Sequence, residues 1–243
     1  MISARRVVID GLSNTRDLGG FITEAGKITK FNVFFRSESL FYLDSSNVTM
    51  LEKYGITNCI DIHGQVDDQN RLHPFQDSQK FEYRCIPILS DLIKHKGTKK
   101  DNFQEADWVD VNIRMLETNK QWVKEVITAC ADAKSGTIIH CRTGKSRTSL
   151  ICMILMMLAK VPSVDIVAEF ATTEIYMKKK YDEFLKNSFH SEGFYKSSAF
   201  ILDRTIEHIN NKYIDVVGYL KSCEVSDITM RKIIDKFVCE IDI

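Results

Sequence analysis

The stretch His140–Ser149, HCRTGKSRTS, lies between two apolar segments, GTII at 136–139 and LICMILMML at 150–158. This order predicts a buried strand, a short polar loop and a buried helix. Two kinds of phosphate-binding loop share the arrangement. One ends in Gly-Lys-Ser and binds nucleotide phosphates, and the other begins with a cysteine, ends with an arginine and attacks phosphorus.

The spacing of the glycines separates the two kinds. The nucleotide-binding loop, G-x-x-x-x-G-K-[ST], requires a glycine five positions before Gly144. That position is Ile139, inside the predicted strand. The nucleotide-binding interpretation therefore fails at the spacing.

The cysteine interpretation fits. Five residues separate Cys141 from Arg147, between the predicted strand and the predicted helix. A loop this short directs its backbone amides to one point, and the helix N-terminus adds positive potential. Arg147 can bind two phosphoryl oxygens as a fork, and the local field stabilises the Cys141 thiolate. We therefore expect Cys141 to attack phosphorus and form a cysteinyl-phosphate, with Thr148 donating a hydrogen bond when the thiolate leaves.

The other loop residues are expected to bind the substrate phosphate or to shape the loop. Gly144 permits backbone geometry that a Cβ atom would obstruct, and His140 is expected to orient the loop through hydrogen bonds. The full set of expected substrate-binding residues is Arg142, Thr143, Gly144, Lys145, Ser146 and Thr148.

The composition is that of an ordinary globular protein. The chain has 243 residues, of which 44% are hydrophobic and 27% charged. Its 33 basic and 33 acidic residues cancel, which gives no reason to expect nucleic acid as a partner. The segment LICMILMMLAKV is too short to span a membrane, so no integral membrane segment is expected. The start of the chain lacks the apolar region of a secretory signal.

The chain has seven cysteines, and no pair has the spacing of a metal site. Those within apolar stretches are Cys59, Cys85, Cys130 and Cys152. This pattern favours reduced, buried cysteines, so we expect a cytoplasmic protein with no metal and no other cofactor. For Cys59 an alternative is a reversible disulfide that protects the nucleophile from oxidation.

Strand and helix patterns alternate along the first two thirds of the chain. Strands are expected at 6–10, around a hairpin that turns near 24–26, and at 56–63, 81–89 and 137–140. Helices are expected at 44–55, from about 105, at 119–136 with Gly136 as the stop, after the loop, and over most of 164–243.

The alternation predicts an α/β fold with a central, mostly parallel sheet flanked by helices. We expect a single phosphate-handling domain over 1–243, in which 164–243 is a mainly helical C-terminal part. At the carboxyl edge of such a sheet, the loops after IDIH, IPIL and TIIH meet. The basic triplet at 178–180 is expected to be a solvated helix face.

Further motifs accompany the loop: NTRDLGG at 14–20, FFRSESL at 34–40 and YGITNCIDIHG at 54–64. Together with the loop they resemble a bacterial tyrosine-phosphatase family, within the cysteine-dependent tyrosine and dual-specificity phosphatases. Its members carry N-x-R-D-L-G-G near the start and H-C-x-x-G-K-D-R-T-G at the loop. The resemblance covers nearly the full length. It implies a phosphomonoester hydrolase, with a protein tyrosine or dual-specificity phosphatase acting on a phosphorylated protein as the first interpretation.

The chain departs from the family pattern at three positions. Ser146 stands where the family has an aspartate that is thought to serve acid–base steps in some members. His63 stands where it has an arginine, and Ser149 where it has a glycine. Serine cannot replace the aspartate as a proton donor, so the departures bear directly on the general acid.

The general acid is expected elsewhere. In the broader superfamily, an aspartate on the loop after the preceding strand protonates the leaving oxygen, and Asp91 matches that place. Asp91 is therefore our first candidate, and capping of a turn is the alternative role. His63, Asp67 and Asp68 on the neighbouring loop are further candidates.

Two other functions remain open on sequence grounds. Three cations in the loop, Arg142, Lys145 and Arg147, suit a phosphoinositide or inositol phosphate, although the family carries this lysine generally. The missing aspartate would suit a catalytically weak phosphate-binding module. Asp17, next to Arg16, is interpreted as a turn-locking residue that supports the loop from beneath.

Overall fold

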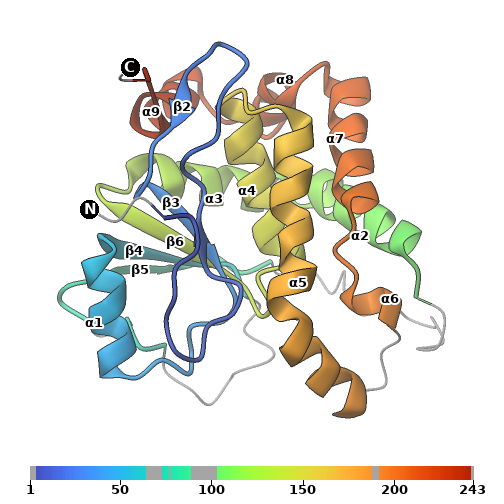
Figure 1. The fold of residues 1–243 in the computed structure, drawn as a ribbon. Coiled ribbons are helices and arrows are strands. Elements are labelled where there is room, and N and C mark those ends of the chain that lie inside the picture. Colours follow the sequence, from blue (N-terminus) through green and yellow to red (C-terminus); the bar gives the residue numbers. More distant parts are fainter. Residues whose placement is uncertain (1–3, 64–72, 77, 89–102, 188–191, 242–243) are drawn as a thin grey trace.

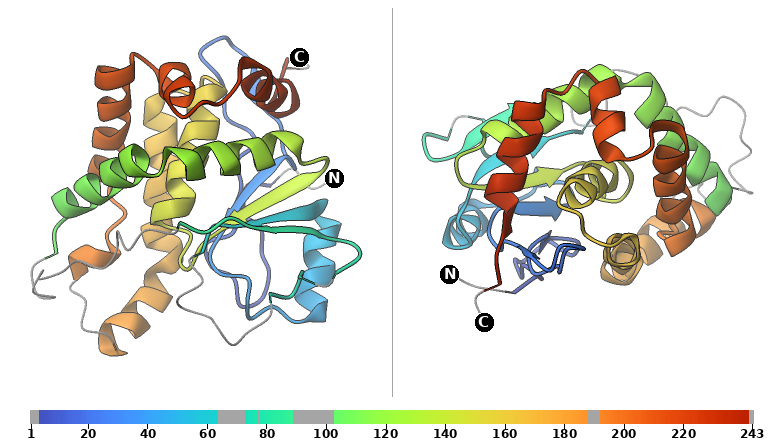
Figure 2. Two further views of the ribbon diagram at one scale, coloured as in Figure 1. Left: turned by 180° about the vertical axis from the view of Figure 1, so that it is seen from behind. Right: turned by 90° about the horizontal axis from the view of Figure 1, so that it is seen from above.

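The computed structural model describes residues 4–63, 73–76, 78–88, 103–187 and 192–241. Figure 1 shows a central sheet with helices on both of its faces, and Figure 2 shows the same layers from behind and from above. The sheet order is β1 (Arg16–Asp17), β3 (Phe34–Ser37), β6 (Gly136–His140), β4 (Ile56–Asp61) and β5 (Glu82–Cys85). β3, β6, β4 and β5 run parallel, and β1 is antiparallel. The prediction of an α/β fold with a mostly parallel sheet is confirmed.

Nine helices occur in the described residues. Their bounds are α1 Ser45–Lys53, α2 Glu105–Thr118, α3 Lys120–Asp132, α4 Ser146–Leu158, α5 Ser163–Asn187, α6 Glu192–Tyr195, α7 Ala199–Tyr213, α8 Val216–Ser222 and α9 Asp227–Phe237. A short pairing of β2 (Ile28–Thr29) with β7 (Val238–Cys239) links the two ends of the chain. No helix in the described part of the chain is long and apolar enough to cross a membrane.

The sheet separates two apolar cores. Strand residues alternate between its faces, so Ile138 packs with Leu51 on the α1 side and Ile139 lies in the core that contains α4. α4 is buried almost all round and contacts α2, α3, α5, α8 and α9. The segment LICMILMML is thus a central helix, and the sheet fixes the position of its N-terminus.

Local signals explain where α1 begins and ends. The Asp44 carboxylate accepts from the backbone N–H of Asn47, and the Asn47 side chain accepts from the Asp44 N–H, which forms a capping box. Gly55, just beyond the helix, has a φ of +76°, a left-handed conformation that glycine adopts readily. The helix predicted at 44–55 is thus confirmed, with Asp44 as its cap and Gly55 just beyond its end.

Two predictions of local structure are wrong, and a third holds only in part. Residues 6–10 form an isolated bridge between Arg6 and Arg16, because the segment pairs with a two-residue strand only. Gly136 does not end a helix: α3 stops at Asp132 and Gly136 begins β6, where a Cβ would lie 2.5 Å from the Gly55 carbonyl oxygen. The basic triplet is not wholly solvated, since the Lys180 ammonium is 2.8 Å from a Glu38 carboxylate oxygen.

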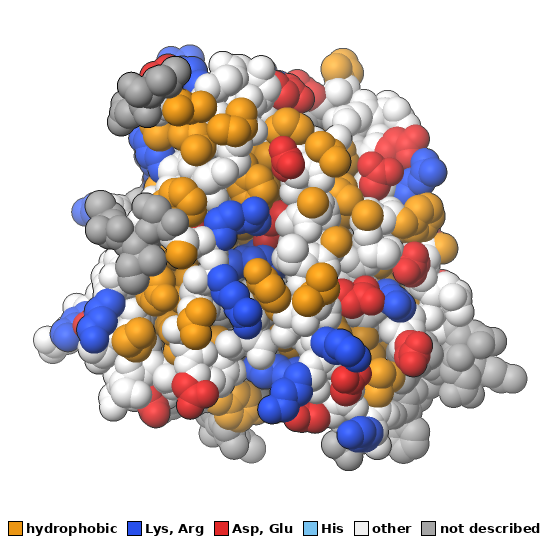
Figure 3. Space-filling model, viewed as in Figure 1, with side chains coloured by type: hydrophobic (Ala, Val, Ile, Leu, Met, Phe, Trp, Pro, Cys, Tyr) orange, Lys and Arg blue, Asp and Glu red, His pale blue; other side chains and the backbone are white. Residues whose placement is uncertain are grey.

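The surface has no single dominant charge on the face that carries α4 and α5. Figure 3 shows basic, acidic and apolar side chains interspersed over this face. The mixture accords with a net charge of zero. Any concentration of positive charge must therefore be local, as at the loop between β6 and α4.

Candidate active site

The loop of interest joins β6 to α4 at the carboxyl edge of the sheet. Cys141 directly follows β6 and is 2% exposed. α4 begins at Ser146, so Arg147 and Thr148 belong to its first turn. The Thr148 hydroxyl donates to Cys141 Sγ at 3.0 Å. A thiolate at this position faces a helix N-terminus and a hydroxyl donor, both of which stabilise negative charge.

Three consecutive loop carbonyls are held by donors outside the loop. The Ser39 N–H donates to the Arg142 carbonyl at 3.1 Å, and Asn14 Nδ2 donates to the Thr143 carbonyl at 2.9 Å. Arg36 Nη2 donates to the Gly144 carbonyl. Because C=O and N–H of a trans peptide point in opposite directions, the amides of the same peptides point away from these donors. The loop thus presents N–H groups for an anion.

The three donors belong to two of the sequence motifs and show what those motifs do in the fold. Asn14 belongs to NTRDLGG, and Arg36 and Ser39 belong to FFRSESL. Both segments lie more than 100 residues from the loop in sequence. The sequence did not predict that these three residues hold the loop carbonyls. The only sign of it was the two motifs in which the residues occur.

Gly144 has no room for a side chain. Its φ is +66°, and a Cβ atom there would lie 2.4 Å from the Ser37 carbonyl oxygen. The end of β3 therefore packs directly against the backbone of the loop. This contact agrees with the expectation that Gly144 adopts a backbone geometry that a Cβ atom would obstruct.

Arg147 lies at the carboxyl end of the neighbouring strand β4. Its Nη1 is 3.5 Å from the Ile62 carbonyl oxygen, and the side chain is half-buried. His63 is buried beside it, and its backbone N–H donates to Asp61 Oδ1 at 2.8 Å. The fold thus brings the ends of β4 and β6 together, as expected for a parallel sheet.

Comparison with known proteins agrees with this geometry. The sequence model described as the tyrosine phosphatase family matches residues 7–239. The chain belongs to the tyrosine phosphatase family. The predicted family membership and the prediction of a phosphatase are thereby confirmed.

A relative and a solved structure illustrate how far the similarity extends. A tyrosine-protein phosphatase of Nostoc commune is 24% identical over 213 residues, which cover 81% of this chain and 71% of that protein. The crystal structure of P. aeruginosa TpbA is 12% identical, with a TM-score of 0.39, over 82% of this chain and 90% of that one.

The Lys145 side chain of this phosphatase packs against α2 and α6. Its side chain is 4% exposed, its ammonium donates to the Phe194 carbonyl of α6 at 2.6 Å, and it lies 4.0 Å from the ring centroid of Trp108 in α2. Burial lowers the pKa of Lys145 well below its ordinary value. Ser146 donates to Asn112 Oδ1 of α2 at 3.2 Å. Both side chains, expected to bind substrate, are committed to helices.

His140 takes part in a buried histidine pair. The Nε2 atoms of His140 and His73 are 3.1 Å apart, and the Phe75 N–H donates to His73 Nδ1. A neutral His73 with Nδ1 as acceptor carries its proton on Nε2, so it donates to His140 Nε2. The pKa of both rings is lowered to about 3. Burial is the main cause, and the neighbouring histidines are the second. His140 is therefore neutral and fixed as one tautomer beneath Cys141.

The same histidine pair belongs to a group of side chains that could bind a metal ion. Within the described residues, Cys59, His73 and His140 form the one group whose donor atoms, all within 4.8 Å of one another, could hold an ion. A ligating histidine donates its other ring N–H outward, whereas His73 Nδ1 accepts from Phe75. The geometry fits a histidine–histidine hydrogen bond better than a pair of metal ligands.

Cys59 is an unsuitable disulfide partner for Cys141. Cys59 is fully buried in the core on the α1 side, while Cys141 belongs to the core on the α4 side. The sheet lies between them. The structure thus favours the interpretation of Cys59 as core packing over a protective disulfide.

Asp17 holds a turn, in keeping with its structural interpretation. Its carboxylate accepts from the N–H groups of Gly19 and Asn32, each at 2.7 Å. Burial raises its pKa to about 6, against those two hydrogen bonds. The candidate acids Asp91, Asp67 and Asp68 lie outside the described residues.

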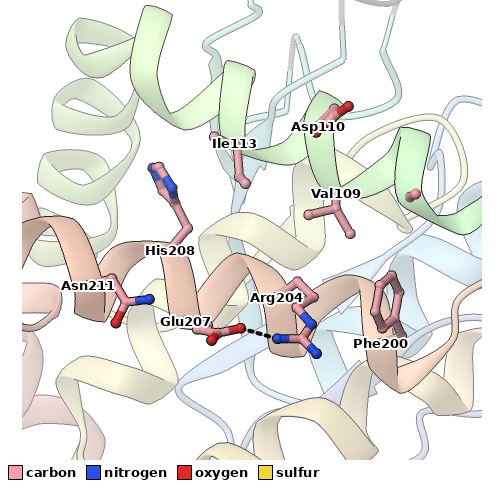
Figure 4. Close-up of a pocket in the computed structure, with 9 residues that line it drawn as sticks. Val109, Asp110, Ile113, Phe200, Arg204, Glu207, His208 and Asn211 are labelled. Carbon is pink, nitrogen blue, oxygen red and sulfur yellow. Dashed lines mark hydrogen bonds and ion pairs between the residues drawn. The ribbon is translucent and has the colours of Figure 1, made fainter.

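A groove of about 370 Å³ lies between α2 and α7, apart from the loop. Figure 4 shows Val109, Ile113 and Phe200 on its walls, with an ion pair between Arg204 and Glu207. None of the loop residues lines it. The groove has no nucleophile beside a helix N-terminus and is not a candidate for the phosphatase site.

Replacing Gly144 by alanine should abolish phosphate binding. The added Cβ meets the Ser37 carbonyl, so the loop must shift, and a displacement of about 1 Å costs on the order of 100-fold in kcat/KM. The measurements are kcat/KM and competitive inhibition by inorganic phosphate. Gly26→Ala is the matched control, because Gly26 has a similar φ of +72° but open space around it. Wild-type kinetics in Gly144→Ala would contradict the loop geometry described above.

Acidification should destabilise the wild type more than a His73→Phe variant. The pKa of folded His73 lies below that of the unfolded chain, so the unfolded state gains a proton as the pH falls through about 6.5 while the folded state does not. Between pH 7.5 and pH 5 the wild type should lose about 2 kcal/mol of unfolding free energy relative to the variant.

Urea unfolding across this pH range measures the difference, and Phe75→Leu serves as a control that lowers stability but keeps both histidines. The opposite trend of Asp17, whose pKa is raised to about 6, is common to all variants and cancels. Parallel pH profiles for the wild type and His73→Phe would show that the pair is not held neutral.

Proposed function

We propose that this member of the family is a phosphotyrosine phosphatase that acts through a cysteinyl-phosphate on Cys141. The observation that carries the proposal is the 3.0 Å contact between the Thr148 hydroxyl and Cys141 Sγ at the start of α4. A structural cysteine would not need a hydroxyl donor and a helix N-terminus at one sulfur atom. Anchored loop carbonyls support the same function, because they leave the amides to the phosphoryl oxygens.

The proposed reaction has two steps. In the first, the Cys141 thiolate forms a bond to phosphorus, the ester P–O bond breaks, and a general acid protonates the leaving phenolate. In the second, water attacks phosphorus, the conjugate base accepts its proton, and the S–P bond breaks to return the thiolate. Arg147 neutralises charge on the equatorial oxygens in both steps. Asp91 remains the proposed acid and base from its place in the sequence.

The orientation of Lys145 supports the proposed substrate class. A second phosphate on an inositol ring would need a further cation beside the loop, and Lys145 instead binds α2 and α6. The geometry therefore favours a monoester such as phosphotyrosine in a protein over a phosphoinositide or inositol phosphate. A non-catalytic binding module is less well supported, because Cys141 and Thr148 are already in contact. All seven cysteines are free thiols, which fits the cytoplasmic location that we propose.

Phosphate release should be fastest from a phosphotyrosine peptide. The assay compares the purified wild type and Cys141→Ser on that peptide and on a panel of phosphoinositides and inositol phosphates, with EDTA present throughout. Cys141→Ser should lose turnover on every substrate, since serine is a much weaker nucleophile than a thiolate. It should still bind the peptide.

Each outcome has a distinct meaning. Preferred release from the inositol compounds would reassign the substrate class and leave the mechanism intact. Turnover by Cys141→Ser would refute the covalent mechanism. A single stoichiometric burst by the wild type without further turnover would identify a phosphate-binding module.

Thr148→Val should slow the second step. Without the hydroxyl, the departing thiolate loses a hydrogen bond to a charged group, worth on the order of 10- to 100-fold in rate. Both kcat and KM should fall, and phosphoenzyme should accumulate in rapid-quench experiments with a good leaving group. Thr29→Val, a buried threonine in β2 whose hydroxyl bonds the Leu18 carbonyl, controls for lost stability. An unchanged burst in Thr148→Val would remove Thr148 from the mechanism.

A further inference from the structure

Two buried arginines behind the loop share a single carboxylate. Arg16 and Arg36 are 1% and 0% exposed, and Glu169 of α5 is 3% exposed. One oxygen of Glu169 binds Arg16 Nε, and the other binds Arg36 Nη1 at 2.6 Å. The carboxylate thus holds both guanidinium groups at once.

The far ends of both arginines reach the loop. Arg36 Nη2 donates to the Gly144 carbonyl and to Ser149 Oγ in α4. Arg16 Nη1 donates to both oxygens of Asn14, and Asn14 Nδ2 donates to the Thr143 carbonyl. From each oxygen of Glu169 a chain of hydrogen bonds therefore ends on one of two consecutive loop carbonyls.

The charges in this group do not cancel. The pKa of Glu169 is lowered although burial opposes this, because two guanidinium groups adjoin it. The pKa of Arg36 is raised by Glu169 and by the cysteines, Cys141 among them, against its burial. Cys152 of α4 also faces Arg36, and its pKa, raised by burial to about 12, keeps it neutral. Two positive charges and one negative charge leave one net positive charge behind the loop that begins at Cys141.

We propose that Glu169 is a positioning residue for the phosphatase reaction. It holds Arg16 and Arg36 so that they fix the carbonyls of Thr143 and Gly144, and it balances only one of the two positive charges, leaving the other for the thiolate. The inference rests on the proposed function. The simpler alternative is a buried ion network that contributes only to folding, since breaking such a network is strongly destabilising in any protein.

Three variants separate the positioning of the loop carbonyls from the net charge of the buried group. Arg36→Lys keeps the charge and loses the fork, because one ammonium cannot reach Glu169, Gly144 and Ser149 as a guanidinium does. Arg36→Met loses both. Glu169→Gln keeps the shape and removes the negative charge. Ile209→Val, in the core at α7, is the control for general destabilisation.

Two readouts are used on the full chain: kcat/KM with the phosphotyrosine peptide, and the pH profile of Cys141 alkylation by iodoacetamide. In Arg36→Lys, kcat/KM should fall on the order of 100-fold with little change in the alkylation profile. In Arg36→Met, the profile should also move to higher pH, by about one unit. In Glu169→Gln, the profile should move to lower pH while kcat/KM falls, a combination that lost stability alone does not produce.

The outcomes distinguish this inference from the function it rests on. If the variants lower only the melting temperature, as Ile209→Val does, with wild-type kcat/KM and alkylation per folded molecule, the positioning role is refuted. If the wild type releases no phosphate but the alkylation profiles move as stated, the proposed function fails while the charge balance stands. If Glu169→Gln does not fold, the comparison of Arg36→Lys with Arg36→Met decides.

Discussion

The direction of three peptide groups is the constraint on which the site depends. The carbonyls of Arg142, Thr143 and Gly144 are each held from behind, so the opposing amides are directed into the loop before any substrate arrives. A free loop of this length would lose about 1–2 kcal/mol per residue on ordering. The protein meets that cost during folding, and the donors are drawn from β3, from the residues just after it and from the segment before β1. Preorganisation of this kind is the main source of electrostatic stabilisation in enzyme sites.

Three basic side chains of the loop have a defined place. The buried His140 is neutral and bonded to His73. Lys145, which adjoins the loop in sequence, has its ammonium against Trp108 and Phe194. Arg147 remains at the edge of the sheet, near the end of β4. Under the proposed function, this distribution would direct the positive potential of the loop at one phosphoryl group.

Helices before and after the loop are part of the site's support. α5 contributes Glu169, α6 accepts the Lys145 ammonium, and α2 binds Ser146 through Asn112. The groove between α2 and α7 lies apart from these contacts. Displacing α6 would disturb the loop directly, because its Phe194 carbonyl binds Lys145. Displacing α5 would disturb the loop through Arg16 and Arg36, which Glu169 holds.

Sequence alone determined the loop, the helix that follows it and the parallel sheet, since these depend on short-range spacing and on strong apolar periodicity. The candidate nucleophile and arginine came from that spacing, and the threonine contact agrees with it. Only the tertiary structure revealed that Lys145 turns away, that Gly136 opens a strand, and that Glu169 joins Arg16 and Arg36. Glu169 stands in an ordinary helical pattern, DIVAEFATT, more than 130 residues from either arginine. The role of a buried charged residue depends on the groups that it contacts. The packing of the whole chain brings those groups to it, and the neighbouring residues in the sequence do not reveal them.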